Sequence, residues 1–170
     1  MKIRTETHED TKQIHSITYQ AFENHPHHEP GAKPTEHLIV DGLRRDNALT
    51  VSLVCEANNE VIGHIAFSPI LIDGEASTWV GLGPVSVIPE HQGKGIGGAL
   101  IREGEAQVKQ LGYQGIVLLG DPSYYGRFGF ESHPNLTFAD VPAEYFLVKG
   151  FENTIPKGEV TYHKAFFETA

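Results

Sequence analysis

Four glycines fall within the six residues 93–98, directly after an apolar run and before an amphipathic helical pattern. The order predicts a strand, a short turn and then a helix that begins in the glycines. Glycine adopts positive φ and lets the backbone approach a ligand closely. The first N–H groups of a helix have no intrahelical partner and carry partial positive charge. The segment therefore predicts an anion site, most naturally for phosphate, to which Lys94 adds a formal positive charge.

Residues 93–98 also satisfy the dinucleotide fingerprint G-x-G-x-x-G, with Asp121 downstream as the acid that would contact a ribose. In a dinucleotide site the strand runs almost directly into the first glycine, whereas residues 88–92 intervene here. A Walker A loop is excluded because Lys94 is followed by glycine and not by serine or threonine. A glycine-rich turn without a ligand is the remaining alternative, but so many glycines would be conformationally costly there.

Length and composition bound the class of protein. With 170 residues the chain is about one domain long, so we expect a single domain over residues 1–170. Residues 1–7 lack the apolar core of a signal peptide, and no apolar stretch approaches the length of a membrane span. The single cysteine, Cys55, favours a reducing compartment, and we expect a cytoplasmic protein. The formal net charge of −9 disfavours a nucleic-acid partner.

Periodicity and turn residues predict the elements. Helices are expected over residues 8–23, 35–45, 95–111 and 121–128. Strands are expected near residue 3 and over residues 48–57, 61–70, 77–87, 115–119, 144–149 and 158–167. The residues expected to turn inward on the third helix are Leu100, Ile101, Val108 and Leu111. This order predicts an α/β fold around a central mixed sheet.

The glycine segment and its flanks closely resemble the coenzyme A pyrophosphate loop of the GNAT superfamily of N-acetyltransferases. The family pattern is Q/R-x-x-G-x-G/A, which Gln92, Gly95 and Gly97 match. A second motif, residues 124–130, is similar to the family signature Y-x-[KR]-x-G-F. The resemblance implies a twisted, mostly antiparallel mixed sheet flanked by helices. It also implies a V-shaped splay between the strands before and after the glycine-loop helix.

The resemblance covers about residues 3–130, leaves C-terminal strands over about 131–170, and is most similar to the YhbS-like branch. It implies that acetyl-CoA is the cosubstrate and that a primary amine of a small molecule or protein attacks its thioester directly in a ternary complex. No metal is expected, no membrane partner is expected, and a homodimer is compatible with the family. The residues also leave open a non-catalytic coenzyme A-binding regulator and a nucleotide-dependent oxidoreductase.

The resemblance also implies roles for single residues. Tyr125 matches the tyrosine that protonates the departing thiolate, while Tyr124 is the better candidate for aromatic packing. The backbone N–H of Val87 would contact the acetyl group and its oxyanion. The residues expected to bind the coenzyme are Val85, Ser86, Val87, Gln92, Gly93, Lys94, Gly95, Ile96, Gly97, Gly98, Asp121, Ser123 and Tyr124. The sequence departs from the family where Asp121 and Ser123 stand in place of the usual asparagine.

The general base is less well defined. His64 or Glu56 would take the proton of the amine through ordered water. For His64 the alternative is a hydrogen-bonded histidine at the sheet edge.

The His- and Glu-rich residues 25–29 resemble a metal tract in composition, but their spacing fits no common metal site. We expect the loop over residues 25–30, together with the strand that carries His64 and Phe67, to line the acceptor entrance. A solvated loop is the alternative.

Overall fold

The structure, a computed structural model, describes residues 1–23 and 32–167. Its helices are α1 (Thr11–Phe22), α2 (Glu36–Arg45), α3 (Ile96–Gln110) and α4 (Pro122–Tyr125). Its strands are β1 (Lys2–Thr5), β2 (Val51–Ala57), β3 (Glu60–Ile72), β4 (Glu75–Val87), β5 (Gly115–Leu119), β6 (Leu136–Thr137), β7 (Phe146–Gly150) and β8 (Gly158–Tyr162). Short 3-10 turns are η1 (His8–Asp10), η2 (Pro89–His91), η3 (Gly126–Phe128), η4 (Ala143–Tyr145) and η5 (Lys164–Phe166).

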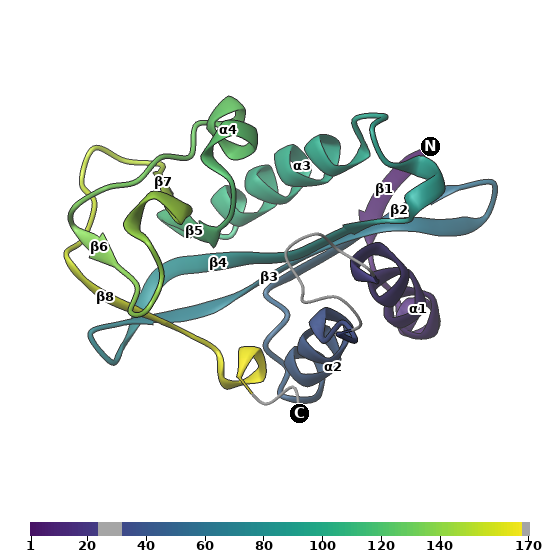
Figure 1. Cartoon of the computed structure of the whole chain (residues 1–170), viewed down its shortest axis with the longest axis horizontal. Helices are drawn as coiled ribbons and strands as arrows, with labels where there is room; N and C mark the ends of the chain where they lie inside the picture. Colours follow the sequence, from purple (N-terminus) through teal and green to yellow (C-terminus); the bar gives the residue numbers. More distant parts are fainter. Residues whose placement is uncertain (24–31, 168–170) are drawn as a thin grey trace.

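The strands form a mixed sheet in the order β1-β2-β3-β4-β5-β7, and β8 joins the far end of β3 with β6 beside it. Neighbours along the main path are antiparallel except β4 and β5, which α3 connects in parallel. Helix α3 covers one face, and α1 and α2 cover the other (Figure 1). The fold is therefore the helix-flanked, mostly antiparallel mixed sheet that the family resemblance implies.

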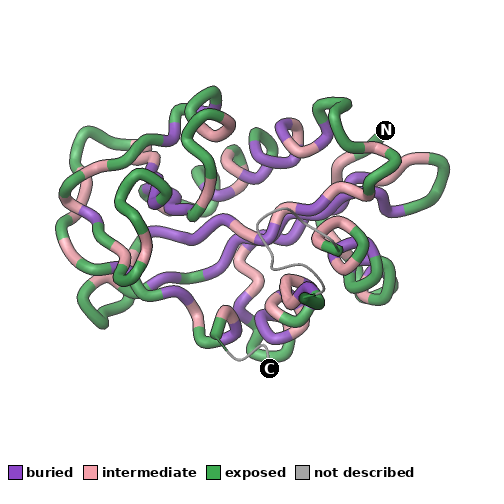
Figure 2. The backbone as a smooth tube through the Cα atoms, viewed as in Figure 1, coloured by how far each residue is buried: buried purple, intermediate pink, exposed green. Residues whose placement is uncertain are grey.

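Strands β2, β3 and β5 are buried over most of their length, as the tube in Figure 2 shows. The core under α3 includes Leu53, Ile65, Val80, Leu100 and Ile101. The core under α1 and α2 includes Ile14, Ile17, Val40, Val54 and Val61. Phe67 belongs to the α3 side, where a Cβ at Gly104 would lie 2.3 Å from its ring. The expectation that Phe67 lines an acceptor entrance is therefore wrong, because the ring fills the core beneath α3.

The splay implied by the resemblance lies between β4 and β5. The two strands pair at three positions, the last of which joins Gly81 to Val117. Beyond Gly81 the rest of β4 pairs with β3 alone and continues to Val87. The sheet therefore opens at the carboxyl end of β4, next to the start of α3 (Figure 1).

A bulge in β4 accompanies this opening. The register passes from Phe67–Leu82 to Ile65–Val85, so that Gly83 and Pro84 together face a single residue of β3. An extra residue bends a strand and increases its local twist. Pro84 has no N–H to donate to a ladder. Both effects favour the separation of β5 from β4.

Two expectations of local structure need correction, and one strand was not expected. The strand predicted over residues 158–167 ends at Tyr162, and η5 follows it. Leu111 is 60% exposed, because α3 ends one residue earlier and the inward-facing period ends with it. The two-residue strand β6 was not predicted, since so short a segment carries no periodicity.

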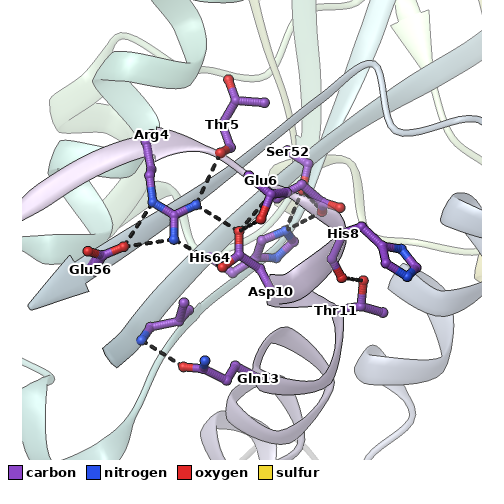
Figure 3. A network of polar contacts seen from close by, with 12 residues as sticks. Arg4, Thr5, Glu6, His8, Asp10, Thr11, Gln13, Ser52, Glu56 and His64 are labelled. Atoms are coloured by element: carbon purple, nitrogen blue, oxygen red, sulfur yellow. Dashed lines mark hydrogen bonds and ion pairs between the residues drawn. The ribbon is translucent and has the colours of Figure 1, made fainter. Parts of the chain in front are cut away.

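An ion-pair network fastens β1 to η1 and β2 (Figure 3). Arg4 donates to both oxygens of Asp10, at 2.7 and 3.0 Å, and to Glu56 at 2.9 Å. The backbone N–H of Thr7 also donates to Asp10, at 2.7 Å. The Arg4 hydrogen bonds are the main cause that lowers the pKa of Asp10 to about 2. The carboxylate of Asp10 is therefore stabilised in the folded protein.

We predict that Asp10→Asn lowers the free energy of unfolding by about 2 kcal/mol at neutral pH, because the folded pKa of Asp10 is depressed. The stabilisation is fully present above the ordinary pKa of 3.8 and is lost as the pH falls toward 2. Denaturant unfolding across this range measures the difference. Glu9→Gln, at an exposed neighbour, is the control and should leave stability nearly unchanged. A difference that stays constant with pH would contradict the prediction.

Candidate active site

The glycine segment forms the start of α3 as the sequence predicts. Gly93 and Gly95 have φ angles of +77° and +83°, in the left-handed region that favours glycine. The N–H of Ala99 donates to the carbonyl of Gly95 at 3.1 Å. The N–H groups of the first helical residues before Ala99 therefore have no partner within the helix. These groups can bind an anion.

A cavity of about 390 Å³ lies against this helix start. Its lining includes most of the residues expected to bind a coenzyme, and it adds His91 and Phe128, which sequence reasoning missed. The lining residues are Val87, His91, Gln92, Gly93, Gly95, Ile96, Gly97, Gly98, Arg102, Tyr124, Arg127 and Phe128. Residues from the end of β4, the loop, α3 and α4 therefore meet at one place.

Two arginines supply positive charge to this cavity. The guanidinium of Arg102 lies 5.0 Å from the ring centroid of Phe128, and that of Arg127 lies 4.8 Å from the centroid of Tyr124. Such cation–π contacts hold a guanidinium in place over a ring. Lys94 is exposed and is not part of the lining. The cavity therefore combines helix N–H groups with two positioned cations and suits a phosphate-bearing ligand.

The backbone of the last residues of β4 faces the splay. Ile88 donates its N–H to the carbonyl of Ile62 at 3.0 Å, so the backbone N–H of Ile88 points toward β3. Bonded and non-bonded pairs alternate in an antiparallel ladder, which turns the amides of Val87 and Val85 away from β3. The side-chain amide of Gln92 donates to the carbonyl of Val87 at 2.8 Å, in agreement with this direction. A fixed N–H there can stabilise a developing oxyanion.

The two tyrosines of the second motif lie in different places. A Cβ at Gly97 would lie 3.3 Å from the hydroxyl of Tyr124, which is part of the cavity. The ring of Tyr125 lies against Gly120, where a Cβ would approach it to 2.4 Å. Burial raises the pKa of Tyr125 to about 12, and Tyr124 adds a smaller effect. The Tyr125 hydroxyl therefore keeps its proton at neutral pH and can act as an acid.

The side chains of Asp121 and Ser123 bond to each other at the start of α4. Oδ1 of Asp121 accepts hydrogen bonds from the backbone N–H and the hydroxyl of Ser123, both at 2.8 Å. The expected coenzyme-binding residues that do not line the cavity are Val85, Ser86, Lys94, Asp121 and Ser123.

The two candidate bases have different surroundings. Glu56 forms an ion pair with Arg4. His64 is fully buried, its Nε2 lies 2.8 Å from the hydroxyl of Ser52, and burial lowers its pKa to about 4. His64 is therefore unprotonated at neutral pH.

Two further features concern metals and membranes. The histidines at residues 25–29 lie outside the described residues. Within residues 1–23 and 32–167 no group of three His, Cys, Asp or Glu side chains is placed to hold a metal ion. In the same part of the chain no helix is long and apolar enough to cross a membrane.

The fold thus places a cavity suited to a phosphate-bearing ligand beside the open edge of β4, at the start of the helix that connects β4 to β5. The acetyltransferase (GNAT) family model matches residues 9–130, and the chain belongs to this family.

Similar proteins agree with this assignment. The chain is 37% identical over 132 residues to the uncharacterized N-acetyltransferase YhbS of Escherichia coli strain K12, which covers 77% of this chain and 74% of that protein. A crystal structure of YhbS from Escherichia coli in complex with CoA matches with a TM-score of 0.89 at 32% identity, over 99% of this chain and 93% of that one. A GNAT family acetyltransferase from Brucella melitensis in complex with acetyl-CoA matches with a TM-score of 0.84 at 47% identity, over 97% of both chains.

We predict that Gly120→Ala destabilises the protein by about 1–3 kcal/mol, because the new Cβ would overlap the ring of Tyr125. The cost should be much smaller in a Tyr125→Ala background, which a double-mutant cycle of denaturant unfolding measures. Gly126→Ala is the matched control, since a Cβ there meets nothing within 4 Å. Equal costs for Gly120→Ala in both backgrounds would show that Tyr125 does not occupy this place.

Proposed function

We propose that this protein is an acetyl-CoA-dependent N-acetyltransferase that passes the acetyl group to a primary amine by direct attack in a ternary complex. The observation that carries the proposal is the cavity at which the start of α3 meets the end of β4. Two arginines that stack on aromatic rings also line this cavity. The complexes of the similar proteins from Brucella melitensis and Escherichia coli with acetyl-CoA and CoA support it.

The pyrophosphate of the coenzyme would bind the N–H groups at the start of α3, with Arg102 and Arg127 balancing its charge. Gly97 and Gly98 let the phosphates approach the helix backbone. The pantetheine arm would follow the splay between β4 and β5 toward Val87. An acidic protein with a net charge of −9 thus meets an anionic coenzyme through a local positive site.

In the reaction the amine nitrogen bonds to the acetyl carbon and the carbon–sulfur bond breaks. The N–H of Val87 would stabilise the oxyanion of the tetrahedral intermediate. Tyr125 would give its proton to the departing thiolate. His64 would take the proton that the amine releases, through a water molecule. Each role is performed by a group of this chain, and no step needs a metal.

We also propose the class of acceptor, the cellular location and the assembly of the protein. The acidic net charge suits a cationic amine as the acceptor. The free, buried Cys55 supports a reducing, cytoplasmic location. We propose one catalytic domain over residues 1–170 that is able to form a homodimer.

The oxidoreductase alternative is disfavoured, since η2 separates β4 from the glycines and the sheet is mostly antiparallel.

We predict that Gly97→Glu abolishes acetyl-CoA binding, because a carboxylate would occupy the phosphate cradle. Gly95→Asp should do the same, although its positive φ adds backbone strain. Calorimetric titration and the thermal shift with increasing acetyl-CoA measure the effect. Ala106→Glu places the same charge on an exposed position of α3 and should bind normally. Unchanged affinity in Gly97→Glu would contradict the loop assignment.

We predict that Tyr125→Phe lowers single-turnover acetyl transfer by about 10²-fold, the lower end for a general acid, because thiolate is a fair leaving group. The ring and its packing remain, so acetyl-CoA affinity should hardly change. Tyr124→Phe is the matched control and should be milder. If Tyr124→Phe were inactive and Tyr125→Phe normal, the acid would be the other tyrosine; if both were normal, the proton would come from elsewhere.

A further inference from the structure

A row of polar side chains is buried on the sheet face that α1 and α2 cover. A Cβ at Gly63 would meet two side chains of α3 at 3.2 Å, so the next residue, His64, faces α1 and α2. Ser86 of β4 is the register partner of His64 and shares its face. Ser52 of β2 bonds to His64 on the same face. The polar row consists of His64, Ser86 and Ser52, whose exposed fractions are 0%, 2% and 6%.

The hydrogen bonds of this row define where the proton of His64 lies (Figure 3). The hydroxyl of Ser52 donates to the carboxylate of Glu6, which also accepts from Arg44 at 2.8 and 3.2 Å. A carboxylate only accepts and a hydroxyl has one proton, so Ser52 must accept from Nε2 of His64. A neutral imidazole carries a single N–H. Nδ1 of His64 therefore carries no proton and has a free lone pair.

Two atoms of the row have unmet hydrogen-bonding capacity. Among the described residues, Nδ1 of His64 and the hydroxyl of Ser86 are buried without a hydrogen-bond partner. Leaving a buried polar group unsatisfied is energetically unfavourable. Ser86 lies between Val85 and Val87, whose amides face the splay. The pair thus marks a polar position directly behind the strand at which the proposed acetyl transfer occurs.

We propose that Glu6 and Ser52 are positioning residues for acetyl transfer, which hold the proton of His64 on Nε2 so that Nδ1 receives the proton of the attacking amine through a water molecule. This inference rests on the proposed function. In the step the ammonium N–H bond breaks, its electron pair stays on nitrogen, and the water passes a proton to Nδ1. The imidazolium so formed donates to Ser52, and it returns its proton to solvent after the product leaves.

The charges around His64 fit this role. Burial has the largest effect on the pKa of His64 and lowers it, and Arg44 lowers it further. Glu6 and Asp10 raise the pKa, and the carboxylate of Glu6 lies 3.9 Å from Nε2. His64 is thus in its base form at neutral pH, and Glu6 stabilises the transient imidazolium. Removing Ser52 would free the ring to adopt either tautomer. The Nδ1–H tautomer cannot accept the proton.

The tautomer can be measured without any substrate. In protein labelled with ¹⁵N at histidine, the His64 signals are identified by their loss in His64→Gln. We expect the Nε2–H tautomer in the wild type and Ser52→Thr, and a mixture or Nδ1–H in Ser52→Ala. An Nδ1–H tautomer in the wild type would overturn the inference.

Kinetics test the consequence for catalysis, with an amine that the wild type acetylates. Ser52→Ala should lower kcat about 10- to 100-fold, at or below the lower end of the range for general-base assistance because His64 itself remains, and leave the KM for acetyl-CoA unchanged. Ser52→Thr keeps the hydroxyl and should restore most of the rate. Ser68→Ala removes another buried hydroxyl of β3 that bonds nothing in the row, and it should match the wild type.

The outcomes separate this inference from the proposed function. If the wild type acetylates no amine, the proposed function fails and the catalytic role fails with it. If the wild type is active and Ser52→Ala has the same kcat, the positioning role alone is wrong. If Ser68→Ala loses as much activity as Ser52→Ala, the loss reflects core damage and the inference is likewise overturned.

Discussion

The candidate site depends on the separation of β5 from β4 after Gly81. Up to that point the two strands bond each other, and beyond it β4 bonds only β3. The bulge at Gly83 and Pro84 bends the strand where the pairing stops. One edge of β4 is thereby left open along Val85 and Val87. Without this opening the N–H of Val87 would bond a neighbouring strand and would be unavailable for the oxyanion role that we propose for it.

The same strand separates two chemical environments. The side chains of Val85 and Val87 pack with the α3 core, while Ser86 faces the α1 and α2 side with His64. The phosphate cradle and the tyrosines lie toward α3 and α4, and the buried polar row lies behind the strand. Alternation along the extended backbone of β4 thus turns Ser86 to the face opposite Val85 and Val87.

Burial sets the protonation state of both groups in the direction that their proposed roles need. It raises the pKa of Tyr125 to about 12 and lowers that of His64 to about 4. A buried site disfavours the charged form of each side chain, so the phenol keeps its proton and the imidazole remains free of one. The Arg4–Asp10 network holds β1 and η1 beside this region, and Glu6 lies between them.

The sequence by itself determined the features that depend on neighbouring residues: the start of α3, its glycines, the order of the elements and the fold class. Local propensity and spacing are sufficient for these, because the physical cause lies within a few residues. The tertiary structure alone decided which side chains meet. Glu6, Ser52 and His64 are far apart in the chain, and only the registers of β1, β2 and β3 bring them together. The different places of Tyr124 and Tyr125 likewise follow from their packing on Gly97 and Gly120, residues that the sequence does not link to them.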